Sequence, residues 1–148
     1  MGKGVYFTTD YEFAKKWSSR RSNESVVYEA DVDLSDLNVV CFDEHNKDDF
    51  YYLLYLCRIE LEDVAQQTIS KFDGADVVVG GILSGDETFV CELSNNFNNG
   101  DIDEQEFFSK MQNLLKRSQI QYCFKTEKAL EIINRCFRIH AKEQIAIK

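Results

Sequence analysis

Two glycines and a short aromatic strand at the start of the chain are the residues whose spacing is best suited to holding a ligand. Residues 2–8 read Gly-Lys-Gly-Val-Tyr-Phe-Thr. Because glycine has no Cβ, its backbone can turn sharply and can approach a ligand closely. A Gly-x-Gly turn before an apolar strand therefore indicates either a backbone laid against a ligand or a plain turn.

Basic side chains gather at the two ends of an acidic chain. The 148 residues carry a net charge of −9, which argues against a general nucleic-acid-binding protein, since phosphate contacts need a basic face. Residues 1–21 hold five basic and two acidic side chains, and residues 110–148 hold nine and three. If the two ends meet in space, they form a local anion site on an acidic protein. Ordinary solvated charge explains the same distribution.

Cysteine spacing and hydropathy predict a single cytoplasmic domain over residues 1–148. The five cysteines, at positions 41, 57, 91, 123 and 136, show no Cys-x-x-Cys or Cys/His metal spacing. Each lies in an apolar stretch, so we expect buried, reduced thiols with no disulfide and no structural metal. No run of about eighteen apolar residues is present to cross a membrane, and the N-terminus lacks a basic-then-apolar signal segment.

Helices and strands must position the residues at both ends. Residues 5–8 predict a strand, and Thr9 with Glu12 three residues later forms a capping-box start for a helix. The apolar side chains of that helix fall on one face: Phe13, Ala14 and Trp17. Residues 25–33 alternate between apolar and polar types, which predicts a strand with an inward-facing set: Val26, Tyr28, Ala30 and Val32.

The rest of the chain also contains both predicted helices and predicted strands. We predict strands at residues 38–42, 75–79 and 120–124 and after residue 137. Helices are predicted from residue 48, with helix or turn continuing to about residue 69, over residues 107–115, and from the cap Thr126. Residues 88–93 fit either a strand or a helix, and the Asn-rich residues 95–100 predict a loop. Because the order lacks a regular βαβ alternation, it indicates the α+β class.

Three segments carry a resemblance to a known family: residues 2–10, the helix with Ala14 and Trp17, and residues 121–130. Together they resemble a bacterial family, the domain of unknown function 3990 family. That family is distantly related to ADP-ribosyltransferases. Elements between them lie in the same order as in that family, so the resemblance spans nearly the whole chain. The opening is also similar to the Gly-Lys-Gly-aromatic-Tyr-Phe strand of poly-ADP-ribose polymerase catalytic domains. The implied fold is an ADP-ribosyltransferase-like pair of split antiparallel β-sheets flanked by helices.

The resemblance implies that the chain uses NAD. Tyr6 then belongs to the motif whose aromatic residue stacks on nicotinamide, and Gln121 is the catalytic residue that bonds the nicotinamide ribose. Trp17 corresponds to a stacking aromatic on the following helix, and Gly4 to the backbone beside the nicotinamide amide. Lys3 is a candidate for the pyrophosphate, together with Lys15 and Lys16. Without the resemblance, Tyr6 and Trp17 fit core aromatics equally well, and Gln121 fits an ordinary strand residue.

The chemistry of these residue types suits cleavage of the nicotinamide–ribose bond, which builds oxocarbenium character. A π face under the leaving group and an oxygen lone pair near the ribose both help. Because the Gln121 amide is neutral, it can position a hydroxyl group but cannot act as a strong base. Glutamine therefore fits transfer to a good nucleophile, or a weak enzyme, and the acceptor class stays open: protein, nucleic acid, small molecule or water.

The resemblance also implies that the family's first strand, with Leu-Tyr-His-Gly, is missing, since neither His45 nor His140 aligns with its ribose-anchoring histidine. A late start codon, a natural truncation and a non-catalytic derivative each explain this. A missing strand leaves an exposed edge near residues 5–8, where we expect a protein partner or a homodimer. Two functions follow: NAD-dependent mono-ADP-ribosyl transfer by the full-length form, as the effector of a bacterial toxin or defence locus, or an inactive interaction module. An acidic domain with no ligand at all is the third alternative.

Overall fold

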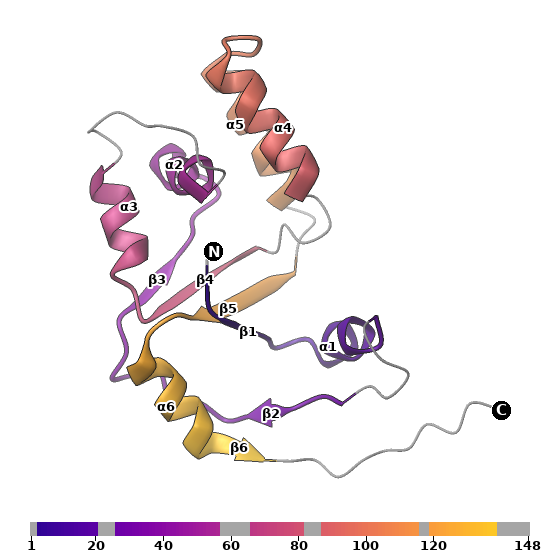
Figure 1. Cartoon of the computed structure of the whole chain (residues 1–148), viewed down its shortest axis with the longest axis vertical. Helices are drawn as coiled ribbons and strands as arrows, with labels where there is room; N and C mark the ends of the chain where they lie inside the picture. The colour runs from indigo at the N-terminus through magenta and orange to yellow at the C-terminus, as the bar shows by residue number, and fades with distance from the viewer. Residues whose placement is uncertain (1–2, 21–25, 57–65, 82–86, 116–118, 139–148) are drawn as a thin grey trace, which may run out of the picture.

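A computed structural model describes residues 3–20, 26–56, 66–81, 87–115 and 119–138 of the chain. Its elements alternate irregularly between helix and strand (Figure 1). In chain order they are β1 (Val5–Thr8), α1 (Tyr11–Ser18), β2 (Glu29–Ala30), β3 (Val39–Cys41), α2 (Lys47–Leu56), α3 (Gln66–Asp73), β4 (Val77–Gly81), α4 (Glu87–Asn98), α5 (Glu104–Leu115), β5 (Ile120–Phe124), α6 (Glu127–Cys136) and β6 (Phe137–Arg138).

Four strands form the central sheet in the order β1-β5-β4-β3, and β2 pairs with β6 in a separate ribbon. The α+β class predicted from the sequence is therefore confirmed. The pairs β1–β5, β4–β5 and β2–β6 are antiparallel as expected, whereas β3 and β4 run parallel. The N-terminal strand β1 occupies one edge of this sheet, at the position where an edge strand was expected.

Each face of the sheet has its own core. On one face, Val78 and Cys123 pack against Tyr52 of α2 and Phe72 of α3, and all four residues are nearly or completely buried. On the opposite face, the core contains residues of β4, β5 and α6: Val77, Phe124, Ala129 and Ile133. The sheet is thus covered by α2 and α3 on one side and by α6 on the other (Figure 1).

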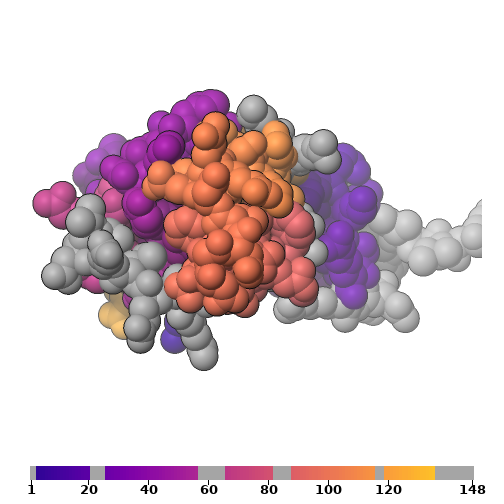
Figure 2. Space-filling model, turned by 90° about the horizontal axis from the view of Figure 1, so that it is seen from above, coloured from indigo at the N-terminus to yellow at the C-terminus, as the bar shows by residue number. Residues whose placement is uncertain are grey.

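The α4–α5 hairpin packs on α2 and lies away from the sheet (Figure 1). Its core joins three helices through Phe50 and Leu54 of α2, Leu93 of α4, and Phe107 and Met111 of α5. Figure 2 looks onto this end of the molecule, where the hairpin fills the centre and α2 lies directly against it. Helix α2 is therefore the bridge between the hairpin and the sheet.

Three local predictions are corrected by the structure. Helix α1 is capped by Asp10 and not by Thr9, since the Asp10 carboxylate accepts a 2.9 Å hydrogen bond from the Phe13 N–H. Val26 and Tyr28, predicted to face inward, are 45% and 54% exposed, and the strand in this region is confined to β2. Residues 95–98, predicted as loop, continue α4.

The prediction of uniformly buried thiols is also corrected. Cys123 is buried, but Cys41, the last residue of β3, and Cys91 on α4 are exposed. Cys57 and His140 lie outside the described residues. The prediction that Thr126 caps a helix is confirmed, since its hydroxyl accepts a 3.3 Å hydrogen bond from the Ala129 N–H at the start of α6.

Candidate functional site

Pairing of β1 with β5 brings the two ends of the chain together and places Tyr6 and Gln121 on one face of the sheet. Tyr6 lies opposite Cys123, and Thr8 lies opposite Gln121. Because side chains alternate between the two faces of a strand, positions two apart share a face. This arrangement defines the β1–β5 face, made of Gly4, Tyr6 and Thr8 from the first segment and Gln121, Cys123 and Lys125 from the second.

Gln121 lies between small neighbours. Thr8 is its partner on β1, and Gly80, which has no side chain, is its partner on β4. The Gln121 side chain is half-buried. The Thr8 hydroxyl donates to the Ile120 carbonyl at 3.2 Å and accepts from the Asp10 N–H at 3.2 Å, which fixes the end of β1 beside Gln121. The amide of Gln121 therefore has room beside it on both neighbouring strands.

The phenol of Tyr6 and the thiol of Cys123 interact across the β1–β5 pair, where the two residues lie opposite each other. Burial raises the pKa of Tyr6, and the hydrogen bond that its hydroxyl donates to Cys123 raises it further. Burial also raises the pKa of the Cys123 thiol, and the Tyr6 hydrogen bond partly opposes this rise. Even so, Tyr6 is 41% exposed. The site thus combines a neutral phenol, a neutral thiol and an accessible aromatic ring.

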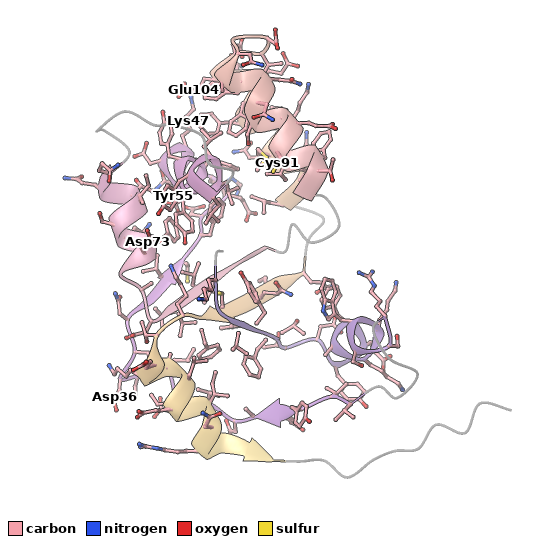
Figure 3. The ribbon with its side chains drawn as sticks, viewed as in Figure 1. Asp36, Lys47, Tyr55, Asp73, Cys91 and Glu104 are labelled. Carbon is pink, nitrogen blue, oxygen red and sulfur yellow. The ribbon has the colours of Figure 1, made fainter. Side chains whose placement is uncertain are left out.

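Beyond Cys123, a cluster around Lys125 ties β5 to α2 and α3. The Lys125 ammonium donates to the Tyr52 hydroxyl at 3.1 Å, to the Phe72 carbonyl at 2.7 Å and to the Asp73 carboxylate at 3.4 Å. Burial raises the pKa of Tyr52, with the nearby Asp73 carboxylate as the second cause. Figure 3 shows Asp73 at the end of α3, beside α2. This cluster closes the Lys125 end of the face, so the exposed part of the face lies at the Tyr6 end.

Packing explains why glycine is present at position 4, whereas the sequence predicted a contact with the ligand. A Cβ on Gly4 would lie 2.6 Å from the Cys123 Sγ and 2.6 Å from the Phe124 carbonyl oxygen. Real Cβ atoms essentially never come this close to another heavy atom. The residue therefore has to be glycine so that β1 can lie against β5, and this need alone accounts for it.

Trp17, Lys15 and Lys16 belong to α1, and Lys3 precedes β1. The Trp17 ring stacks on Phe13 with centroids 6.0 Å apart, and the Arg20 guanidinium lies 4.9 Å from it. The neighbours of the Trp17 ring thus come from α1 and from the residue that follows shortly after it. Helix α1 lies beyond the C-terminal end of β1 (Figure 1). Lys3 is exposed ahead of β1, and Lys16 is exposed on α1, whereas Lys15 lies over the Tyr11 ring at 6.0 Å. The structure brings Tyr6, Gly4 and Gln121 together, and it does not place Trp17 with them.

The basic side chains of the C-terminal region that the structure describes pair with acidic partners. Lys125 pairs with Asp73, and Lys128 lies 3.8 Å from Asp76 and donates to the Asp36 carbonyl oxygen. The Asp76 carboxylate also accepts a 2.5 Å hydrogen bond from the Thr126 hydroxyl. Segments from the two basic regions do meet in the β1–β5 pair, as the anion-site hypothesis required, but Lys125 and Lys128 bind the protein itself.

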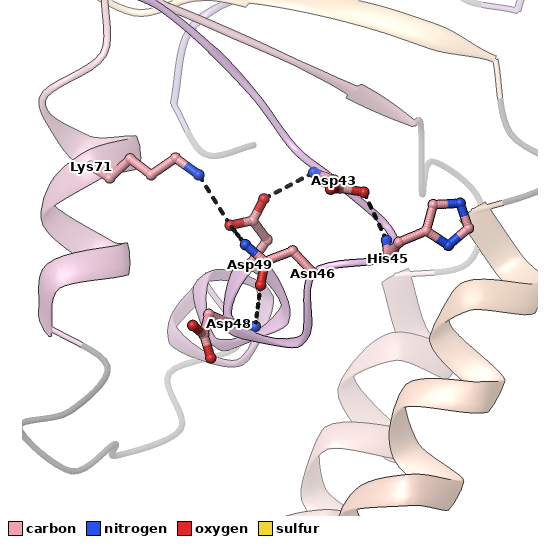
Figure 4. Close-up of polar contacts among 6 residues, drawn as sticks. All are labelled: Asp43, His45, Asn46, Asp48, Asp49 and Lys71. Carbon is pink, nitrogen blue, oxygen red and sulfur yellow. Dashed lines mark hydrogen bonds and ion pairs between the residues drawn. The ribbon is translucent and has the colours of Figure 1, made fainter.

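A buried carboxylate organises the loop before α2 (Figure 4). Asp49, only 1% exposed, accepts hydrogen bonds from the Asp43 N–H at 2.9 Å and from the Lys71 ammonium at 3.1 Å. His45 donates its backbone N–H to Asp43 at 2.9 Å. In the described part of the chain, no group of three His, Cys, Asp or Glu side chains is arranged to hold a metal ion.

Sequence reasoning missed the residues that surround Tyr6. Cys123 could have been found from the alternation of β5, because it lies two positions from Gln121 on the same face. Tyr52, Asp73 and Lys125 could not, because their meeting depends on how α2 and α3 pack on the sheet.

Comparison with known proteins assigns the chain to a family. The family model described as a protein of unknown function, DUF3990, matches residues 1–134, and the chain therefore belongs to that family. Searches of curated proteins and of solved structures give no match. Across the described residues, no helix combines the length and the apolar character needed to cross a lipid bilayer.

Proposed function

We propose that the β1–β5 face binds NAD and that the chain is an ADP-ribosyltransferase-like domain which transfers a single ADP-ribose. The observation that carries the proposal is the register of β1 and β5, which sets an exposed tyrosine ring and a half-buried glutamine two positions apart on one face. Under this proposal the domain acts as the effector of a bacterial toxin or defence system.

The residues on this face fit the two parts of the ligand that react. The Tyr6 ring offers an accessible π surface for the flat nicotinamide ring. The Gln121 amide can accept or donate hydrogen bonds to ribose hydroxyl groups. In the reaction, the bond between ribose and nicotinamide breaks with its electron pair going to nicotinamide. The acceptor's lone pair forms the new bond at the same carbon, and its proton leaves to solvent.

Calorimetric titration with NAD and detection of released nicotinamide by NMR test the proposal. We expect Tyr6→Ala to weaken NAD binding about three- to tenfold, since an aromatic contact contributes about 0.5–1.5 kcal/mol. Gln121→Ala should slow nicotinamide release by about 10²-fold, as loss of one transition-state hydrogen bond does. Tyr11→Ala and Gln105→Ala, at exposed positions on α1 and α5, are the matched controls. Absence of both binding and nicotinamide release would refute the proposal.

A non-catalytic interaction module is the second candidate. It is favoured by the distribution of exposed apolar side chains: seven of the nine large ones among the described residues belong to β1, α1, residues 26–28 and the first residue of β5. Concentrated apolar surface marks interaction sites. Sedimentation velocity tests the homodimer form of this candidate. Dimers that dissociate in Tyr11→Glu but not in Phe89→Glu, whose ring is exposed on α4, would support it, and a monomer at every concentration would contradict it.

A further inference from the structure

Cys123 occupies the centre of the β1–β5 face and leans toward β1. It lies between Tyr6 on β1 and Val78 on β4, and its exposed fraction is 0%. The position of its sulfur follows from Gly4, since a Cβ built on that glycine would come within 2.6 Å of Sγ. The thiol therefore fills the space that Gly4 leaves by having no side chain.

The Tyr6 ring extends from β1 across this thiol. Opposed side chains on neighbouring antiparallel strands have Cβ atoms about 4.5–5.5 Å apart. A tyrosine whose hydroxyl bonds to its own cross-strand partner therefore lies across the neighbouring strand. The hydroxyl end of the ring then meets Cys123, while the residue as a whole stays 41% exposed.

We propose that Cys123 is a positioning residue for Tyr6: the buried thiol, seated over Gly4, accepts the Tyr6 hydroxyl and holds the ring across β5 so that its outer face receives a planar ring of the ligand. The inference rests on the proposed binding of NAD to this face. It assigns no chemical step to the sulfur, because burial raises the pKa of the thiol and keeps it protonated.

The test separates the hydrogen bond from simple packing. Cys123→Ala removes the acceptor, whereas Cys123→Ser keeps an oxygen acceptor in its place. In protein with 13C-labelled tyrosine rings, we expect the Tyr6 ring resonances, assigned with Tyr6→Phe, to shift in Cys123→Ala and to stay near their original positions in Cys123→Ser. NAD affinity should fall about three- to tenfold in the alanine variant, the range expected for a lost aromatic contact, and recover in the serine variant. Cys91→Ser, at an exposed position on α4, is the control.

Tyr6→Phe removes the donor of the same hydrogen bond and leaves no cavity. It therefore tests the proposal even if Cys123→Ala does not fold. It keeps the ring but removes the hydroxyl, and it should weaken NAD binding as much as Cys123→Ala does. The double variant should be no weaker than either single one. Unchanged Tyr6 resonances in Cys123→Ala, a serine variant that behaves like alanine, or full NAD affinity in Tyr6→Phe would each overturn the proposal. If the unaltered protein does not bind NAD, the proposed function fails, and the Tyr6 resonances still decide whether Cys123 positions the ring.

Discussion

The ammonium of Lys125 lies 3.1 Å from the hydroxyl oxygen of Tyr52, so a side chain at the end of β5 is bonded to one from the middle of α2. The Tyr52 ring in turn stacks on Phe72 of α3, with centroids 4.6 Å apart and planes 18° from parallel. Two consecutive helices thus meet a strand about fifty residues further along the chain at one polar contact, and the layer of α2 and α3 is held to the sheet there.

Lys125→Met should lower the free energy of unfolding by about 1–3 kcal/mol, because it leaves buried or half-buried acceptors unsatisfied. Urea denaturation measures the change. Lys110→Met is the matched control, since Lys110 is half-exposed and pairs with Glu106 one turn away on α5, a contact that contributes about 0.5 kcal/mol or less. Equal losses in the two variants would show that the Lys125 cluster does not hold the layers together.

Asp49→Ala should also destabilise the protein by about 1–3 kcal/mol, because the Asp43 N–H and the Lys71 ammonium lose a buried acceptor. Thermal denaturation followed by circular dichroism gives the comparison. Its neighbour Asp48 is exposed in the same first turn of α2, so Asp48→Ala should change stability by about 0.5 kcal/mol or less. A comparable loss at both positions would contradict the role assigned to the buried carboxylate.

Gly4→Ala should destabilise the protein by about 1–3 kcal/mol, the usual cost of forcing an atom into a closely packed site. The added methyl group would meet the Phe124 carbonyl oxygen, which belongs to the backbone and cannot rotate away. Gly100→Asn is the comparison, because Gly100 has a φ of 78° and open space around its Cβ position, and Asn tolerates that conformation. Gly4→Ala should be the more damaging change in urea denaturation, and the reverse order would refute the close approach of β1 to β5.

Asp76 should make stability depend on pH in the acid range. The Thr126 hydroxyl, the Asn38 N–H and the Lys128 ammonium lower the pKa of its carboxyl group. Because the folded-state pKa is below the unfolded-state value of about 3.9, this contribution is complete above that value and is lost as pH falls through the folded-state pKa. The stability of Asp76→Asn, followed from pH 7 down to strong acid, should therefore fall less steeply than that of the unaltered protein. Parallel curves would contradict this assignment.

Most helices and strands could be predicted from local patterns, and the exceptions have physical reasons. The Asn-rich residues 95–98 continue as helix because Phe97 stacks on Phe107 of α5 at 5.0 Å, a tertiary contact that outweighs local preference. The start of α1 was misplaced by one residue because Thr8, Thr9 and Asp10 all suit a cap, and the Thr8 hydroxyl is occupied at the end of β1.

Tyr6, Gly4 and Gln121 could be selected from residue type and family resemblance, but their shared face depends on a strand pairing that no local pattern reveals. The same holds for Cys123, Tyr52 and Lys125, whose contacts join elements from the two ends and the middle of the chain. Trp17 shows the opposite case: its residue type suited stacking, yet the structure surrounds its ring with Phe13 and Arg20.

The pairing of β1 with β5 has a consequence for how the protein is made. The Thr8 hydroxyl and the Ile120 carbonyl oxygen that it contacts are 112 residues apart. During synthesis, β1 leaves the ribosome more than a hundred residues before its partner strand emerges, and it stays unpaired in the meantime. Closing so long a loop is slow, and a waiting apolar strand is prone to aggregate. The nascent chain is thus most vulnerable between the appearance of its first strand and that of its fifth, the interval in which a chaperone would protect it.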